Sequence, residues 1–175
     1  LKLRASWGQL GNTNTNDAWY PFYQTMPVGS NYGWLVNGER PNYATNPGIV
    51  SSKKTWETVE TWDVGLDWSF FNNRLSGSFD YFVRYTYDMI ATAPELPSIL
   101  GTGVPKINNA DMKSYGFELE IGWRDRIKNL SYGVKFVLSD AQQKILKYNN
   151  PDKSLSNPYY EGQKLGEIWG YKTIG

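Results

Sequence analysis

The sequence predicts an all-β protein made of long antiparallel hairpins, and two observations carry this prediction. The stretch from Thr55 to Ile90 contains two runs that alternate apolar and polar residues, joined at Asn72 and Asn73. Alternation with period two is typical of a strand with two different faces, and paired Asn residues tolerate the left-handed backbone of a two-residue hairpin turn. The second observation is that the alternating runs along the chain are separated by connections that are in turn long and short.

The first hairpin has one apolar, aromatic face and one face of small and polar residues. If Asn72 and Asn73 form the turn, Phe70 lies opposite Leu75, and the apolar residues of both strands lie on the same side of the ribbon. Turn and pattern therefore agree on one register. The apolar set is Trp62, Val64, Leu66, Trp68 and Phe70 in the first strand and Leu75, Gly77, Phe79, Tyr81, Val83, Tyr85, Tyr87 and Met89 in the second.

A second hairpin is predicted further along the chain. The runs KSYGFELEIGW and LSYGVKFVL both alternate, and the short connection DRIKN joins them. If Arg126 and Ile127 form the turn, Glu118 lies opposite Lys135, where opposite charges are mildly stabilising. A further strand over residues 1–8 brings the predicted total to five.

Three long irregular segments, 9–54, 91–110 and 140–175, alternate with the two short turns. In up-and-down outer-membrane barrels the periplasmic turns are short and the extracellular loops long, and strands of about ten residues suit a tilted crossing of the membrane. The sequence therefore predicts about five strands of a large antiparallel up-and-down transmembrane β-barrel with long extracellular loops. Aromatic girdles are expected at Trp68, Phe70 and Trp123 near the turns and at Trp7, Trp62, Tyr85, Tyr87 and Tyr115 near the other rim.

The composition excludes several classes of function. The chain has 175 residues, a net charge of +1 and neither Cys nor His, so disulfides, thiolate nucleophiles and imidazole triads are impossible. It has no basic block of the kind that nucleic-acid binding needs. No apolar run is long enough for a transmembrane helix, whereas a mean hydropathy of -0.56 is compatible with a transmembrane barrel.

Two alternative functions remain open at this stage. A soluble β-sandwich that binds carbohydrate would bury Leu66, Phe79, Leu119 and Val134 in a core, and alternation alone does not separate this fold from a barrel. A passive outer-membrane porin would have the same strands as a transporter. A second sheet packed on these apolar residues would favour the sandwich, and side chains that point outward would favour the barrel.

Three stretches resemble the SusC/RagA-like TonB-dependent outer-membrane transporters. They are the hairpin TWETVETWDVGLDWSFFNNRLSGSFDYFVRYTYDMI, the strand INNADMKSYGFELEIGW and the segment EGQKLGEIWGYKTIG. The opening LRASWGQLGN is similar to the strand that precedes them in the family. Lys54-Thr55 and Ser114-Tyr115 depart from the family pattern.

The resemblance implies active import of an oligosaccharide or peptide across the outer membrane of a Gram-negative bacterium. The implied partners are a SusD-like surface lipoprotein, TonB and outer-membrane lipid, with no nucleic acid. No enzymatic activity and no cofactor are expected. Because the chain opens inside a strand pattern, we expect residues 1–175 to be a fragment of the receptor's barrel domain, without the plug domain and most of the barrel.

Two sets of side chains are candidate sites. Carboxylates that lie two residues apart on a strand could mimic a catalytic pair, but ion pairs explain such patterns more simply. We therefore assign these carboxylates to a lumen or plug contact and expect no catalytic residue. Nor does any spacing fit a calcium loop, and no metal site is expected. The lumen- or plug-facing set is Asp63, Asp67, Asp80, Arg84, Glu118, Glu120 and Lys135. Aromatic side chains in the long loops could stack on sugars or line a partner surface, and these are Trp19, Tyr20, Tyr23, Tyr32, Trp34, Tyr159 and Tyr160.

Overall fold

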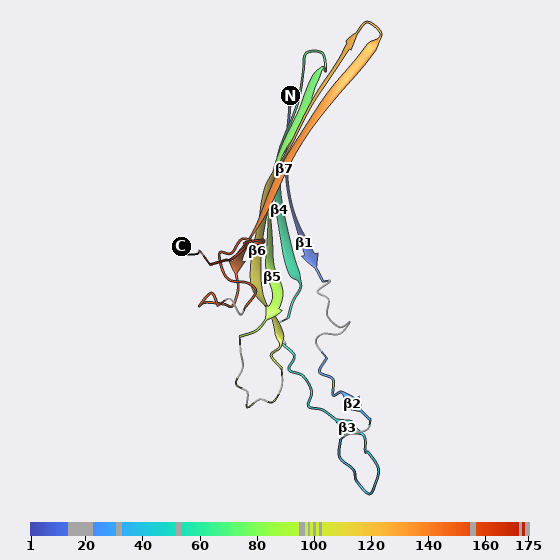
Figure 1. The fold of residues 1–175 in the computed structure, drawn as a ribbon, viewed down its shortest axis with the longest axis vertical. Helices are drawn as coiled ribbons and strands as arrows, with labels where there is room; N and C mark the ends of the chain where they lie inside the picture. The colour runs from blue at the N-terminus through green and yellow to red at the C-terminus, as the bar shows by residue number, and fades with distance from the viewer. Residues whose placement is uncertain are drawn as a thin grey trace.

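The main body of the chain is one antiparallel sheet of five strands that follow one another in the order β1-β4-β5-β6-β7 (Figure 1). The computed structural model describes residues 1–13, 23–30, 33–51, 54–94, 97, 99, 101, 103–154, 157–171 and 173. The five strands are β1 (Lys2–Asn12), β4 (Glu57–Phe70), β5 (Leu75–Thr92), β6 (Lys106–Ile127) and β7 (Leu130–Lys147). A separate small hairpin is formed by β2 (Val28–Gly29) and β3 (Tyr43–Ala44). The predicted all-β fold with about five strands is confirmed.

The first hairpin has the predicted register, with Phe70 opposite Leu75. The predicted turn is also found, because Asn72 and Asn73 are the two central residues of a β-turn over residues 71–74, in which Arg74 N–H donates to Phe71 O at 3.2 Å. Phe71, Asn72 and Asn73 have φ angles of 54°, 54° and 67°. Left-handed backbone is costly for most side chains and mildest for Asn. Since the two Asn residues take the central positions of the turn, they fix the predicted register.

The second hairpin turns two residues later than predicted. Ile127 faces Leu130, and the turn residue Lys128 has a φ angle of 53°. Glu118 consequently lies opposite Ser139, so its predicted pairing with Lys135 is wrong. Moving a turn by two residues leaves each side chain on the same face, because strand side chains alternate with period two, and the alternation pattern could not detect the difference.

Strand β7 extends well beyond its predicted end. Residues 140–147 were predicted as loop, but they continue to pair with β6 as far as Lys147. This part of the chain, DAQQKILK, has polar residues on both faces, so it lacks the alternation that marks a strand with one apolar face. The prediction for these residues is therefore wrong, and the last long connection begins at residue 148.

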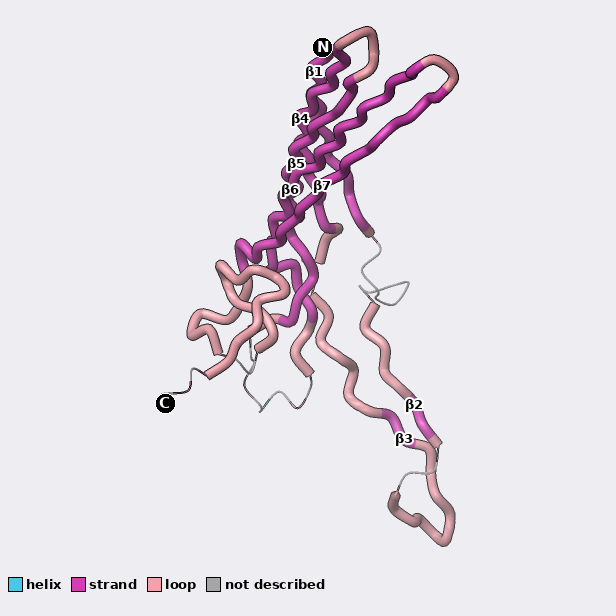
Figure 2. Tube along the Cα trace, turned by 45° about the horizontal axis from the view of Figure 1, so that its top comes forward, coloured by secondary structure: helices cyan, strands magenta, loops and turns pink. Residues whose placement is uncertain are grey.

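The long and the short connections lie at opposite ends of the sheet. Figure 1 shows the loop 71–74 and the turn after Ile127 at the end that carries the N-terminus, and Figure 2 shows the same arrangement from a second direction. The connections before β4, before β6 and after β7 all leave from the other end, which we call the outer end. The predicted alternation of short turns and long loops is confirmed.

The sheet is a single layer with two unlike faces. Register places Leu66, Phe79 and Leu119 in one row on the face that we call apolar. No second sheet among the described residues packs on this face, and Phe79 and Val134 are 38% and 70% exposed. A sandwich would bury these side chains, so the structure gives the sandwich alternative no support. No helix within the described ranges is long and apolar enough to cross a membrane.

Candidate functional site

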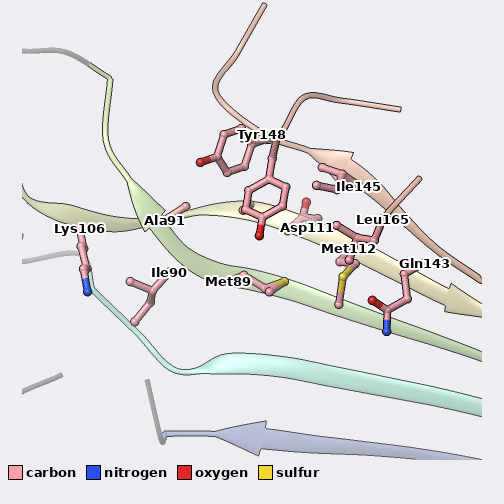
Figure 3. A pocket seen from close by; sticks show the side chains of 12 residues that line it. Met89, Ile90, Ala91, Lys106, Asp111, Met112, Gln143, Ile145, Tyr148 and Leu165 are labelled. Atoms are coloured by element: carbon pink, nitrogen blue, oxygen red, sulfur yellow. The ribbon is translucent and has the colours of Figure 1, made fainter. Parts of the chain in front are cut away.

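A pocket of about 450 Å³ lies at the outer end of β5, β6 and β7 (Figure 3). Strand ends form its floor, and the segment that follows β7 closes it from the side. The lining is mostly aliphatic and thioether, with a few polar groups at its border. The lining residues are Met89, Ile90, Ala91, Lys106, Ala110, Asp111, Met112, Gln143, Ile145, Tyr148, Tyr159 and Leu165.

The pocket opens on the polar face of the sheet. Met112 pairs with Ile145, and two residues along β6 Ser114 pairs with Gln143. By the two-residue period these side chains share a face with Glu118. The polar face therefore becomes apolar at its outer end, where the pocket lies.

The chain after β7 folds back and pairs with the edge of the sheet through an isolated bridge, between Lys144 and Lys164. Gly162 N–H donates to Ile145 O and Ile145 N–H to Gln163 O, both at 2.9 Å, and Leu165 N–H donates to Gln143 O at 3.0 Å. Because adjacent strand residues point to opposite faces, this pairing directs Leu165 into the pocket. This part of the chain belongs to the segment whose resemblance to the transporter family was noted in the sequence.

Asn150 organises the loop that brings Tyr159 to the pocket. Its side chain is buried, at 4% exposure, and its Nδ2 donates to Ser154 O at 3.0 Å and to Tyr159 O at 2.9 Å. Its Oδ1 accepts from Ser154 N–H at 2.9 Å. The Tyr159 ring then packs edge-on against Tyr148, 5.6 Å between centroids. Sequence reasoning missed Asn150, although the Asn-Pro-Asp turn that it opens is a recognisable signal.

The structure does not gather the predicted loop aromatics into one site. Tyr159 lines the pocket, whereas Tyr160 packs within its own loop, with its hydroxyl 2.9 Å from a Glu167 oxygen. Burial and this hydrogen bond raise the pKa of the Tyr160 phenol. Tyr23 and Trp34 are exposed on the first long connection, remote in sequence from the pocket. The remaining three candidates, Trp19, Tyr20 and Tyr32, lie outside the described residues.

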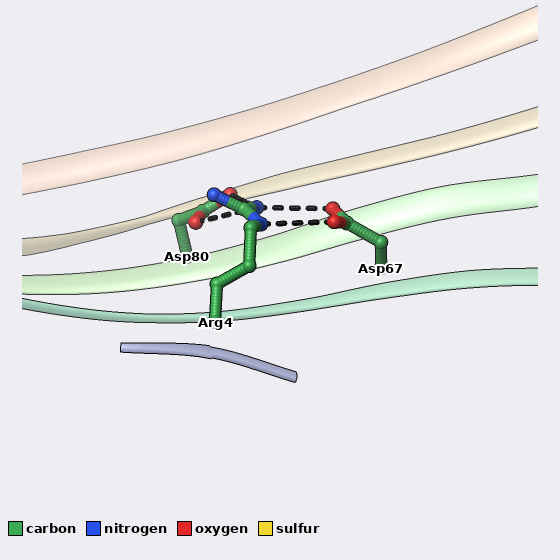
Figure 4. Close-up of polar contacts among 3 residues, drawn as sticks. All are labelled: Arg4, Asp67 and Asp80. Atoms are coloured by element: carbon green, nitrogen blue, oxygen red, sulfur yellow. Dashed lines mark hydrogen bonds and ion pairs between the residues drawn. The ribbon is translucent and has the colours of Figure 1, made fainter. Parts of the chain in front are cut away.

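The polar face carries an ion cluster centred on Arg4 (Figure 4). The guanidinium donates to both oxygens of Asp67, at 2.9 and 3.0 Å, and to Asp80 at 3.0 Å. It reaches Asp80 by crossing strand β4 over Gly65, where an added Cβ would come within 2.8 Å of Nη2. A bidentate Arg–carboxylate pair is strongly oriented, so the cluster ties β1 to β4 and β5.

The other predicted lumen-facing residues also lie on the polar face. By register Asp63 lies in the next row of this face and Arg84 in the row after that, both towards the outer end. Lys135 reaches Glu120 diagonally across the β6–β7 pair at 2.7 Å. Within the ranges that the structure describes, no three carboxylates lie close enough together to hold a metal ion. The sequence pattern therefore identified the members of this face but not the ion pairs between them.

The apolar face ends in an aromatic row towards the outer end. Trp7 lies opposite Trp62, and both indole N–H groups donate to one Glu60 oxygen at 2.9 Å. Tyr85 stacks on Tyr87 with ring centroids 5.7 Å apart. Amphipathic rings at the border of an apolar band are typical of membrane girdles.

Comparison with known proteins decides the family. Residues 1–173 match the family model described as TonB dependent receptor-like, β-barrel. The chain belongs to this family. TonB-dependent receptor P3 from Formosa agariphila is 27% identical over 99% of the chain and 18% of the relative, and TonB-dependent receptor SusC from Bacteroides thetaiotaomicron is 27% identical over 88% of the chain and 15% of the relative.

Solved structures agree with this assignment. The RagAB peptide importer matches in its closed-closed state with a TM-score of 0.66 and in its open-open state with a TM-score of 0.65, each at 25% identity. The two matches cover 85% and 86% of this chain, and each covers 16% of the matched importer chain. The sheet thus has the fold of part of a SusC/RagA-like TonB-dependent receptor barrel, and the chain spans less than a fifth of the length of these relatives.

Proposed function

We propose that residues 1–175 form part of the barrel wall of a TonB-dependent importer in the outer membrane of a Gram-negative bacterium, with the plug domain and the other strands outside this chain. The observation that carries the proposal is a single-layer sheet whose apolar face has no protein cover in the described structure. Family membership supports the same conclusion.

The dimensions of the apolar face suit a bilayer. From Trp62 to Phe70 strand β4 advances roughly 26 Å at about 3.3 Å per residue. An outer-membrane barrel carries an apolar band about 25 Å tall between its aromatic girdles. A tilted strand of this length therefore crosses most of such a band, with the polar face directed to the lumen or the plug.

The cargo that we propose is an oligosaccharide or a peptide, captured together with a SusD-like lipoprotein and imported with energy from TonB. The relatives named SusC and RagAB support this class of partner and cargo. On this proposal the pocket lies at the outer mouth of the lumen, where Met89, Met112 and Ile145 offer an apolar surface to a side chain or to the C–H face of a sugar.

Energy coupling separates an importer from a passive porin. Cells that carry the complete receptor would be given fluorescently labelled oligosaccharides and peptides, with TonB present or deleted. We expect uptake of one of these cargo classes to be lost without TonB. Uptake that continues unchanged in the deletion strain would contradict active import and favour the porin alternative.

The pocket itself is tested by filling it. Met112→Trp should raise the cargo concentration at half-maximal uptake several-fold, because the larger ring occupies a cavity of about 450 Å³ that the cargo would otherwise use. Met26→Trp, at an exposed site away from the pocket, is the matched control. An unchanged half-saturation concentration in the correctly inserted Met112 variant would remove the pocket from the transport path.

A further inference from the structure

Three lysines form one row across the outer end of the apolar face. Lys113 on β6 lies directly opposite Lys144 on β7, and Lys144 forms a bridge with Lys164 in the stretch that pairs with the edge of β7. Directly opposed residues in an antiparallel pair project on the same face. The three side chains therefore lie on one face of the sheet, and we call this set the lysine row.

The lysine row lies level with the aromatic row, because Lys113 pairs directly with Tyr85. Two residues closer to the turn that follows β6, Tyr115 lies on the same face as Lys113. The Lys113 ammonium lies 5.2 Å from the ring centre of Tyr85 and 5.5 Å from that of Tyr115, at cation–π distance. In a membrane this level corresponds to the headgroups rather than the hydrocarbon.

The charges in this row lack a protein counterion among the described residues. Like charges placed directly opposite each other destabilise a sheet, and none of Lys113, Lys144 and Lys164 forms an ion pair with a carboxylate in the described structure. Glu60, the acidic residue of the same cross-strand row, is separated from Lys113 by Tyr85 and accepts both indole N–H groups. An external anion bound at this row would offset the repulsion.

We infer that the lysine row binds phosphate groups of a glycolipid in the outer leaflet of the outer membrane. Strands lie about 4.8 Å apart, so the three ammonium groups, each with three donors, can converge on one or two phosphates. Basic residues at a membrane surface favour anionic lipid in the same way. The inference rests on the proposed outer-membrane location and adds a lipid ligand to it.

The test compares phosphorylated lipid A with the same lipid after enzymatic removal of its phosphates. The complete receptor is purified in nanodiscs, and bound lipid is measured by native mass spectrometry. We expect the receptor to retain phosphorylated lipid A at least about tenfold more strongly than the dephosphorylated form. The variant carrying Lys113→Gln, Lys144→Gln and Lys164→Gln should lose this preference.

A control variant removes the same charge elsewhere, with Lys2→Gln, Lys128→Gln and Lys153→Gln. It should keep the preference for the phosphorylated lipid. Equal retention of both lipids by the unmodified receptor would overturn the inference, as would equal loss in both variants. Insertion and TonB-dependent uptake are measured on the same preparations, so a receptor that inserts and imports without lipid preference contradicts only this inference, whereas one that fails to insert contradicts the proposed function.

Discussion

At Gly116 two neighbouring strands approach each other too closely for a side chain. A Cβ at this position would lie 2.4 Å from the carbonyl oxygen of Asp140, 3.0 Å from Ala141 Cα and 3.0 Å from the Phe82 ring. The first two atoms belong to the backbone of β7, so they cannot rotate away. The absence of a side chain here allows Phe82 to lie across the polar face.

We predict that Gly116→Ala lowers the free energy of unfolding by about 1–3 kcal/mol, since overpacking must displace β7. Gly8→Ala is the matched control on the same face, because nothing lies within 4 Å of its added Cβ. Urea denaturation of the complete receptor, followed by heat-modifiable gel mobility, measures both. Equal midpoints for the two variants would show that β7 does not pack as described.

Asp88 occupies a bulge in β5 with a φ angle of 57°. Its N–H donates to Asp111 Oδ1 at 2.9 Å, and the register with β6 shifts on either side of Met89. Left-handed backbone costs roughly 1–2 kcal/mol for an ordinary side chain. Asp88→Val should therefore destabilise the barrel by about that amount, while Asp88→Gly should be close to neutral, in the same denaturation assay. A Val variant as stable as the Gly variant would exclude the left-handed bulge.

Among the elements, the loop held by Asn150 makes the clearest prediction. Asn150→Ala removes three hydrogen bonds and leaves the carbonyls of Ser154 and Tyr159 without this buried donor. Because local unfolding then becomes easier, trypsin cleavage after Lys153 in the complete receptor should accelerate about tenfold. Asn149→Ala, at an exposed neighbouring position, should leave the rate unchanged, and equal acceleration in both variants would contradict the role of Asn150.

The two hairpins show how far an element can be derived from sequence. In the first, the apolar pattern and the left-handed tolerance of Asn72 and Asn73 select one register, and that register was found. In the second hairpin, the connection DRIKN allows turns that differ in position by two residues, and such turns leave every side chain on the same face. The alternation pattern therefore could not identify Lys128 as a turn residue. The end of β7 was missed because pairing with β6, rather than alternation, keeps residues 140–147 extended.

The candidate site was less predictable than the fold. Tyr159 was identified, but the pocket needs the ends of three strands and the segment around Leu165 to meet. The Asn-Pro-Asp turn signals where the loop begins, but an alternation pattern does not reveal that Leu165 pairs with Gln143 and closes the pocket. The lysine row likewise becomes visible only through pairing, since Lys113, Lys144 and Lys164 are far apart in the sequence.

At the scale of the whole molecule, the assignment of the two faces can be tested by charge. Phe79→Lys places a charge between Leu66 and Leu119 on the apolar face, which should cost about 2–4 kcal/mol in a bilayer. Ser78→Lys places it between Asp67 and Glu120 on the polar face, where it should be tolerated. Folding yield into lipid vesicles measures both, and the opposite ranking would reverse the assignment of the faces.

The free edges of the sheet have a consequence for assembly. Among the described residues β1 pairs only with β4, and β7 pairs only with β6 from Leu130 to Gln142. In hydrocarbon every backbone N–H and C=O without a partner costs several kcal/mol. On the proposed membrane location, these strands would therefore have to enter the bilayer with neighbouring strands already paired to both edges.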